Sequence, residues 1–109
     1  MEVFYRYRVH GVQARAFEHA YGPTGPWAKL FGRSPNFIGT RLFRHRGDSA
    51  TYLTVDLWES KRDWDAFRAE NSEAYARLDR QLHLLYLEEL LLGYYEGSEE
   101  HRAPPDTRA

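Results

Sequence analysis

Two side chains of this 109-residue sequence could move a proton at neutral pH. His83 is the natural general base, because imidazole has the side-chain pKa closest to neutrality. Tyr7 carries a hydroxyl that could donate a proton. Each also has a purely structural interpretation, His83 as a partly exposed helix histidine and Tyr7 as a core tyrosine whose hydroxyl bonds to the backbone. The sequence leaves both interpretations open.

Aromatic residues make up 16% of the chain, enough to build much of a core from rings. Rings are also the side chains on which planar ligands stack. The rings expected near the two proton-transfer candidates could line a substrate cleft, and they are Tyr5, Trp27, Phe31, Trp64, Phe67 and Tyr75. The alternative for most of them is that they only fill the core.

Other kinds of site find little support in the sequence. The five histidines are widely spaced, with no pair four residues apart, and the absence of cysteine removes thiolate ligands and nucleophiles. Neither a glycine-rich phosphate loop nor a Gly-x-Ser-x-Gly elbow occurs. The net charge of −1 argues against a nucleic-acid partner. We therefore expect no metal, no cofactor and no nucleic acid.

The length suits one domain, which we expect over residues 1–97, followed by a loose polar tail over residues 98–109. No apolar run approaches the roughly 18 residues of a membrane span, and Met1–His10 lacks the apolar region of a signal peptide. The sequence therefore predicts a cytoplasmic protein with no membrane partner.

The elements that must position these residues follow from periodicity and caps. Ser60 and Asp63 form a capping box, which predicts a helix directly after a strand. Gly22–Pro26 must interrupt a helix that starts near Val12, either as a kink or as a lid. Alternation and helical spacing predict strands over 3–10, 36–45, 51–58 and 89–96, and helices over 12–21, 26–32, 60–67 and 71–85.

This order predicts an α+β, ferredoxin-like split βαβ fold (βαββαβ) with an antiparallel four-stranded sheet and helices on one face. The aliphatic side of the central strand is expected to meet the helices, through Leu53, Val55 and Leu57. The bare face would then carry Phe4, Arg6, Arg8, Tyr52, Thr54, Asp56 and Trp58. Because so much ring surface is unfavourable in water, we expect a homodimer that covers it.

Asp56 is expected at that dimer interface, paired across the strands with Arg6, Arg8 or Arg41. The alternative is an anion site for a carboxylated substrate, since arginine binds carboxylates through two parallel hydrogen bonds.

Several short stretches resemble a known family. They are Phe37-Ile38-Gly39-Thr40, Leu57-Trp58-Glu59-Ser60, and Trp64 with Phe67 on the following helix. Over about residues 2–97 the chain resembles antibiotic biosynthesis monooxygenase-like domains of the dimeric α/β-barrel superfamily.

The resemblance implies a cofactor-independent monooxygenase, an oxidoreductase acting on a small aromatic or polyketide-like substrate. Such a site needs a base, a donor that holds the substrate anion, and an apolar cleft, for which His83, Tyr7 and the rings named above are the candidates. The alternative is a non-catalytic dimeric module of the same fold that binds a small apolar ligand or has a stress or regulatory role.

The haem-degrading branch of that family is not expected here. Its strand asparagine is replaced by Tyr5, Arg6 and Tyr7, its helix tryptophan position falls on Phe67, and its haem-ligating histidine position falls near Arg77.

Overall fold

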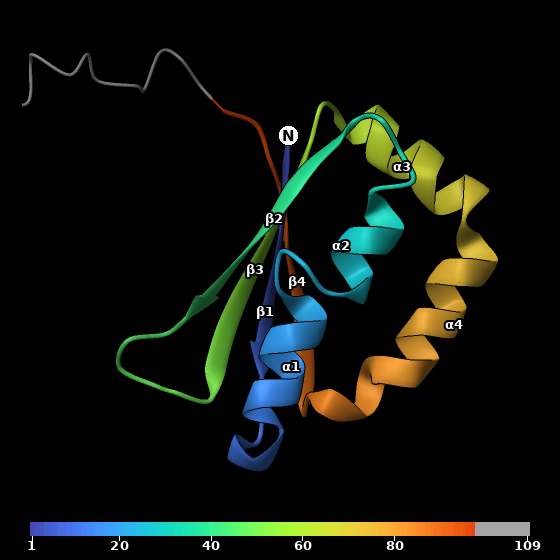
Figure 1. The fold of residues 1–109 in the computed structure, drawn as a ribbon. Coiled ribbons are helices and arrows are strands. Elements are labelled where there is room, and N and C mark those ends of the chain that lie inside the picture. The colour runs from blue at the N-terminus through green and yellow to red at the C-terminus, as the bar shows by residue number, and fades with distance from the viewer. Residues whose placement is uncertain (98–109) are drawn as a thin grey trace, which may run out of the picture.

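A four-stranded antiparallel sheet with helices on one face forms the structure, a computed structural model that describes residues 1–97 (Figure 1). The strands are β1 (Glu2–Arg8), β2 (Phe37–Arg44), β3 (Thr51–Trp58) and β4 (Glu88–Tyr95). The helices are α1 (Ala14–Tyr21), α2 (Pro26–Phe31), α3 (Lys61–Glu70) and α4 (Ser72–Leu82), with short 3-10 turns at Gly11–Gln13 and His83–Leu85. The tail predicted for residues 98–109 lies outside the described residues.

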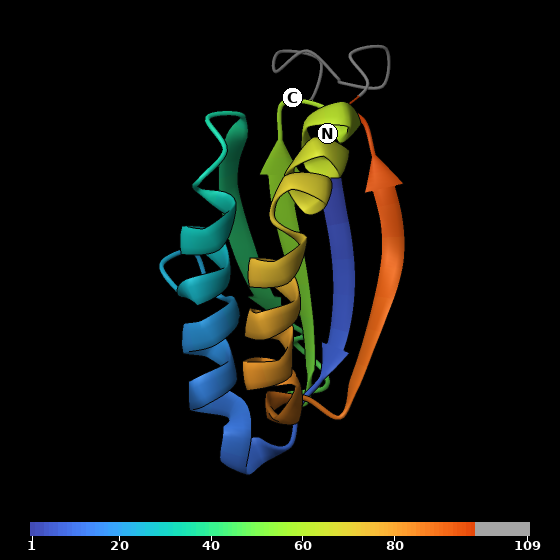
Figure 2. The same cartoon turned by 90° about the vertical axis from the view of Figure 1, so that its right-hand side faces the viewer.

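The strand order is β2-β3-β1-β4, so the first and third strands lie at the centre of the sheet, and the predicted ferredoxin-like arrangement is confirmed. Figure 2 shows α1 and α2 in one column and α3 and α4 in a second column beside it, both over the same face of the sheet. Within residues 1–97, no helix is long and apolar enough to cross a membrane.

Local sequence signals set the helix boundaries. The Ser60 hydroxyl oxygen accepts a hydrogen bond from the backbone N–H of Asp63 at 3.1 Å, as the capping box predicts. Only two residues separate the end of β3 from the start of α3. This short connection fixes the first turn of α3 against the end of a central strand.

The interruption between α1 and α2 is a tight bend. α1 ends at Tyr21, and α2 starts with Pro26 at its first position. A Cβ atom on Gly25 would lie 2.1 Å from the carbonyl oxygen of His19, so only glycine fits the bend. Both helices turn buried residues toward the sheet, so the bend joins two packed helices.

The side chains of β3 face the opposite way from the prediction. Val3 lies opposite Asp56 and Tyr7 lies opposite Tyr52, so the even-numbered residues of β3 share the helix-covered face with the odd-numbered residues of β1. The prediction that Leu53, Val55 and Leu57 meet the helices is therefore wrong, and Tyr52, Thr54, Asp56 and Trp58 are the buried residues there. The physical reason is that both sides of β3 are largely apolar, and the larger rings hide more surface under the helices.

The opposite side of the sheet, here called the open face, is not covered by any helix of residues 1–97 (Figure 1). Strand pairing places on it Phe4, Arg6, Arg8, Arg41, Phe43, Leu53, Val55, Leu57, Leu90 and Tyr95. Asp56 is absent from this set, so the predicted ion pair between Asp56 and an arginine of the open face does not form.

β4 is not a regular strand. Phe4 lies opposite Gly93 while the next residue, Tyr5, lies opposite Leu91, so Leu92 is an extra residue that makes a bulge. Gly93 has a φ of 142°, a conformation that residues with a side chain rarely adopt. The bulge keeps Glu89 and Leu91 facing the helices together with Tyr5 and Tyr7.

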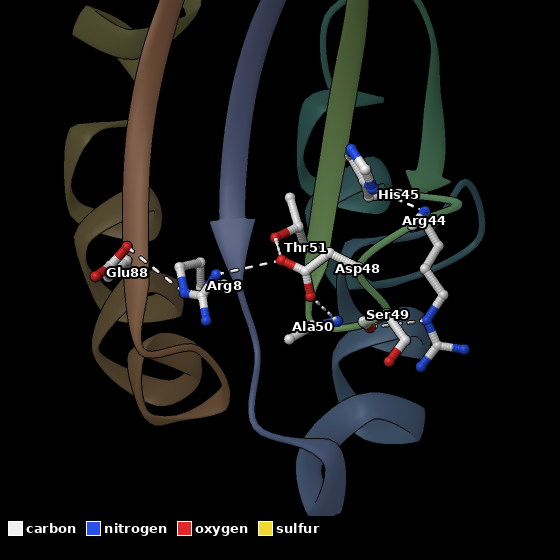
Figure 3. Close-up of polar contacts among 9 residues, drawn as sticks. Arg8, Arg44, His45, Asp48, Ser49, Ala50, Thr51 and Glu88 are labelled. Carbon is white, nitrogen blue, oxygen red and sulfur yellow. Dashed lines mark hydrogen bonds and ion pairs between the residues drawn. The ribbon is translucent and has the colours of Figure 1, made fainter.

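A polar network fixes the turn between β2 and β3 at one end of the sheet (Figure 3). The Asp48 carboxylate accepts hydrogen bonds from the Thr51 hydroxyl at 2.8 Å and from the Ala50 N–H at 3.1 Å. These hydrogen bonds hold the pKa of Asp48 below its usual value. Arg8 links this turn to β4 through two ion pairs. Its Nη1 lies 3.4 Å from Asp48 Oδ2, and its Nε lies 3.9 Å from Glu88 Oε2.

Candidate active site

A cavity lies between the sheet and the helices, and all four strands and all four helices contribute to its wall. Its lining is mostly aromatic with a few polar groups: Tyr5, Tyr7, Tyr21, Trp27, Phe31, Thr40, Thr54, Asp56, Trp64, Tyr75 and Glu89. About 20 Å³ remains for the centre of a water-sized molecule. Because one water needs about 10–15 Å³ on this measure, the cavity as it stands holds roughly one water.

Asp56 supplies a carboxyl group in the wall of this cavity. Its side chain is buried on the helix face of β3, and its Oδ1 accepts a hydrogen bond from the Thr40 hydroxyl at 2.7 Å. Burial raises the pKa of Asp56 to about 6, and the hydrogen bond from Thr40 partly opposes that rise. A carboxyl group with a pKa close to neutrality can act as a general base on a bound substrate.

Tyr7 and Glu89 form a second polar pair in the cavity. The buried Tyr7 hydroxyl donates a hydrogen bond of 2.7 Å to Glu89 Oε2. Burial, followed by the negative charge of Glu89, raises the pKa of Tyr7 well above its usual value, so its hydroxyl keeps its proton. Burial also raises the pKa of Glu89, while the bond from Tyr7 opposes the rise.

Half-buried rings mark the side of the cavity nearest to solvent. Tyr5 and Tyr75 line the cavity and are each partly exposed. The Arg68 guanidinium lies 4.0 Å from the centroid of the Tyr75 ring and 5.2 Å from that of Trp64. A cation over two ring faces is attracted by their quadrupoles, so Arg68 packs against the Trp64 and Tyr75 rings from outside the cavity.

Similarity to known proteins is found by comparing structures and not by comparing sequences. No family model and no curated protein matches the sequence. Among solved structures, a mutant of SnoaB, a cofactor-independent oxygenase from Streptomyces nogalater, is similar at 22% identity with a TM-score of 0.63, covering 90% of this chain and 95% of that one. A candidate antibiotic biosynthesis monooxygenase from Bordetella bronchiseptica is similar at 17% identity with a TM-score of 0.66, covering 89% and 96%.

A third similar structure is PA3566 from Pseudomonas aeruginosa, at 15% identity and a TM-score of 0.62, covering 89% of this chain and 93% of that one. The chain has the antibiotic biosynthesis monooxygenase fold. The family resemblance in the sequence is thereby confirmed at the level of the fold, because such low identities carry no information on substrate.

Within this monooxygenase fold, most of the predicted site residues come together. The cavity wall includes Tyr5, Tyr7, Trp27, Phe31, Trp64 and Tyr75. Phe67 lies behind the wall, where its ring packs 5.3 Å from Trp58 and 5.5 Å from Phe31 between centroids. His83 lies apart from all of them, exposed at the end of α4, with its ring Nδ1 2.9 Å from the carbonyl oxygen of Arg80.

The sequence reasoning missed the polar groups of the cavity. Tyr21, Thr40, Thr54, Asp56 and Glu89 all line it, and none was a predicted site residue. Asp56 carried a usable signal, because a carboxylate in the middle of an otherwise apolar central strand must be neutralised or paired. Assigning that side of β3 to the open face concealed the signal.

Proposed function

We propose that this protein is a cofactor-independent monooxygenase that oxidises a small aromatic or polyketide-like phenol or quinol. The observation that carries the proposal is Asp56, a buried carboxyl with a pKa raised to about 6 in the wall of a ring-lined cavity. The fold supports it, since one similar structure is named a cofactor-independent oxygenase.

In the proposed reaction, the Asp56 carboxylate takes a proton from the activated CH₂ group of an anthrone-like substrate. The substrate carbanion then reduces dioxygen, and a C–O bond forms to give a hydroperoxide that recovers the proton from Asp56. Loss of water breaks the O–O bond and leaves a carbonyl group. The carbon loses four electrons and dioxygen gains four, so no further reductant is required.

The other cavity residues have matching tasks in this proposal. Rings from Trp27, Phe31 and Trp64 exclude water and pack on a planar substrate. Tyr7, on the strand next to that of Asp56, stays protonated and donates its hydroxyl hydrogen to Glu89 on β4, which gives the cavity wall a second polar group. Because the cavity holds roughly one water, a ring substrate needs Tyr5 and Tyr75 to swing outward at the solvent side.

The open face supports a homodimer as part of this proposal. It exposes Phe43 by 39%, Leu90 by 47% and Tyr95 by 53%, next to half-buried Leu53 and Leu57. Exposed apolar side chains gathered on one face, here interleaved with Arg6, Arg8 and Arg41, are typical of an interaction site. A second copy of the chain is the proposed cover.

The experiment measures air oxidation of anthrone and related quinols by quinone absorbance between pH 5 and pH 8, with the buffer rate subtracted. We expect the rate to rise with pH through about 6, as Asp56 ionises. Asp56→Asn should lower it by about 100-fold or more, the range of general-base catalysis. His83→Ala is the matched control and should leave the rate unchanged.

Equal rates for wild type and Asp56→Asn would remove Asp56 from the reaction. A wild-type rate no faster than buffer across the whole panel would favour the alternative, a non-catalytic dimeric module that binds a small ligand.

A further inference from the structure

A groove runs between α2 and α4, which lie side by side over the sheet (Figure 2). About 320 Å³ is open there to the centres of water-sized molecules, against about 20 Å³ in the ring-lined cavity. The groove is lined by two short sets of residues, Pro26, Lys29, Leu30 and Arg33 from the α2 side and Ala74, Arg77, Leu78 and Gln81 from α4. No residue of either set lines the cavity, so the groove is a separate surface of the molecule.

The two walls of the groove have the same spacing. The lining residues follow one another at steps of three, one and three positions on the α2 side, and at the same steps on α4. Residues with this spacing lie on one face of a helix, so each wall is a single stripe about two turns long, or roughly 10 Å. Leu30 and Leu78 hold corresponding places in the two stripes and both pack into the core. Two such stripes with a trough between them form the surface into which a third helix packs.

The charged residues of the groove all have the same sign. Lys29, Arg33 and Arg77 are exposed, no carboxylate belongs to the lining, and none of the three cations forms an ion pair within residues 1–97. The nearby acids Glu70 and Glu73 line a different hollow, at the start of α4. Cations along an apolar trough attract a partner of the opposite charge.

We infer that this groove is a docking site for an amphipathic helix of a partner protein, one with an apolar stripe flanked by acidic side chains. The apolar stripe lies over Leu30 and Leu78, and carboxylates on its two flanks face Lys29 and Arg33 on one wall and Arg77 on the other. This is the helix-in-groove mode of recognition. A small ligand fits less well, because binding pockets surround most of their ligand and this groove is open along its length.

The contact extends over only about two helical turns, so the buried surface is small. Binding is therefore expected in the micromolar range or weaker, as for a transient contact. The inference goes beyond the proposed oxidation and does not depend on it, since the groove shares no residue with the cavity wall.

The test uses a blocked, alanine-based helical peptide of roughly 15 residues, with one stripe of leucines flanked by glutamates. A matched peptide has glutamine in place of every glutamate. Calorimetry measures each Kd, and NMR shifts of backbone amides locate the peptide on the full chain. We expect shifts centred on residues 26–33 and 74–81. The glutamine peptide should bind about 10-fold more weakly, through the loss of two or three exposed ion pairs.

Arg77→Glu is the main variant, and its exposed side chain makes misfolding avoidable. It should weaken binding of the acidic peptide about 10-fold, because repulsion replaces attraction, and change binding of the glutamine peptide less than twofold. Lys29→Glu tests the other wall in the same way. Arg62→Glu is the matched control, since Arg62 is an exposed arginine of α3 that does not line the groove. Thermal unfolding checks that each variant is folded.

Equal affinities of the wild type for the two peptides would overturn the inference, and so would amide shifts that map to the open face. Absence of binding by the acidic peptide would overturn it as well. Octanoate serves as the small-anion probe: saturable shifts in the groove with octanoate but none with the acidic peptide would make the groove a small-ligand site. None of these measurements involves turnover, so the docking site can be supported while the monooxygenase proposal fails, and the reverse.

Discussion

The two faces of the sheet use the same strands for opposite purposes. On β3, the even-numbered residues put rings and one carboxyl group under the helices, whereas Leu53, Val55 and Leu57 face outward. The charged residues differ as well, since Arg6 and Arg8 stay exposed on the open face while Asp56 is buried with Thr40. The covered face thus carries the ring-lined cavity with its buried carboxyl group, and the open face carries exposed apolar and arginine side chains.

This contrast also separates two sources of stability. Ring packing on the covered face contributes favourable burial, while Asp56 on the same face opposes folding whenever it is ionised. The open face contributes less within one chain, because several of its apolar side chains, among them Phe43, Leu90 and Tyr95, are exposed to water. The changes in stability caused by substitutions on the two faces should therefore differ in size, in sign and in their dependence on protein concentration.

The largest expected effect is on the covered face. Trp64 is almost fully buried, with its ring centroid 5.4 Å from that of Trp58 and 5.6 Å from that of Phe31. Trp64→Ala should lower the free energy of unfolding by about 3–5 kcal/mol and weaken ligand binding, as expected when a large core ring is removed. Denaturant unfolding checks this, with Leu84→Ala as an exposed control expected within about 0.5 kcal/mol. A neutral result for Trp64→Ala would contradict the ring-built core.

The second expected effect concerns Asp56, whose replacement should raise stability rather than lower it. The pKa of Asp56 is about 6 in the folded chain against an ordinary value of 3.8, so the folded state holds the proton more tightly. The stability of the wild type should therefore fall as pH rises from about 4 to 6, and above that range ionised Asp56 costs about 3 kcal/mol.

Asp56→Asn keeps a group that can bond to Thr40 and removes this charge. At pH 8 it should raise the free energy of unfolding by roughly 2–3 kcal/mol, with a gain that vanishes near pH 3.5. Thermal and denaturant unfolding at the two pH values measure the difference. A variant less stable than wild type at pH 8 would show that ionised Asp56 stabilises the fold.

The smallest of the three effects tests the open face. Leu90→Glu should raise the dimer dissociation constant by about 30-fold or more. In a two-fold symmetric dimer each copy loses the same apolar contact, and the two losses together come to about 2 kcal/mol. Sedimentation at micromolar concentration measures it. Leu84→Glu, at an exposed leucine of the His83–Leu85 turn, serves as the control. A wild-type mass of one chain would contradict the dimer before any variant is made.

Much of the fold could be predicted because local signals agree with it. The Ser60 cap, Pro26 at the start of α2 and alternation over residues 3–10 and 51–58 each act within a few residues. The orientation of β3 could not be predicted in this way, because large apolar side chains stand on both of its sides and only helix packing decides between them. Because of the same error, Asp56 was expected on the open face and not in the cavity wall.

The candidate base illustrates a second limit. A histidine is the usual first choice for a base by residue type, but the position of His83 depends on where α4 ends and where the chain turns back toward β4. Asp56 has an ordinary pKa far below neutrality, and only tertiary burial raises it to about 6. Rings were easier to place than the base, since any large ring of a small domain tends toward the interior.

The bulge at Leu92 and Gly93 has a consequence for how copies of the chain can meet. β4 is an edge strand, and an unpaired edge is a ready template for strand addition and open-ended aggregation. The extra residue and the φ of Gly93 break the even spacing of backbone donors and acceptors along this edge. Another strand therefore cannot pair with β4 along its full length, which opposes extension of the sheet from this edge.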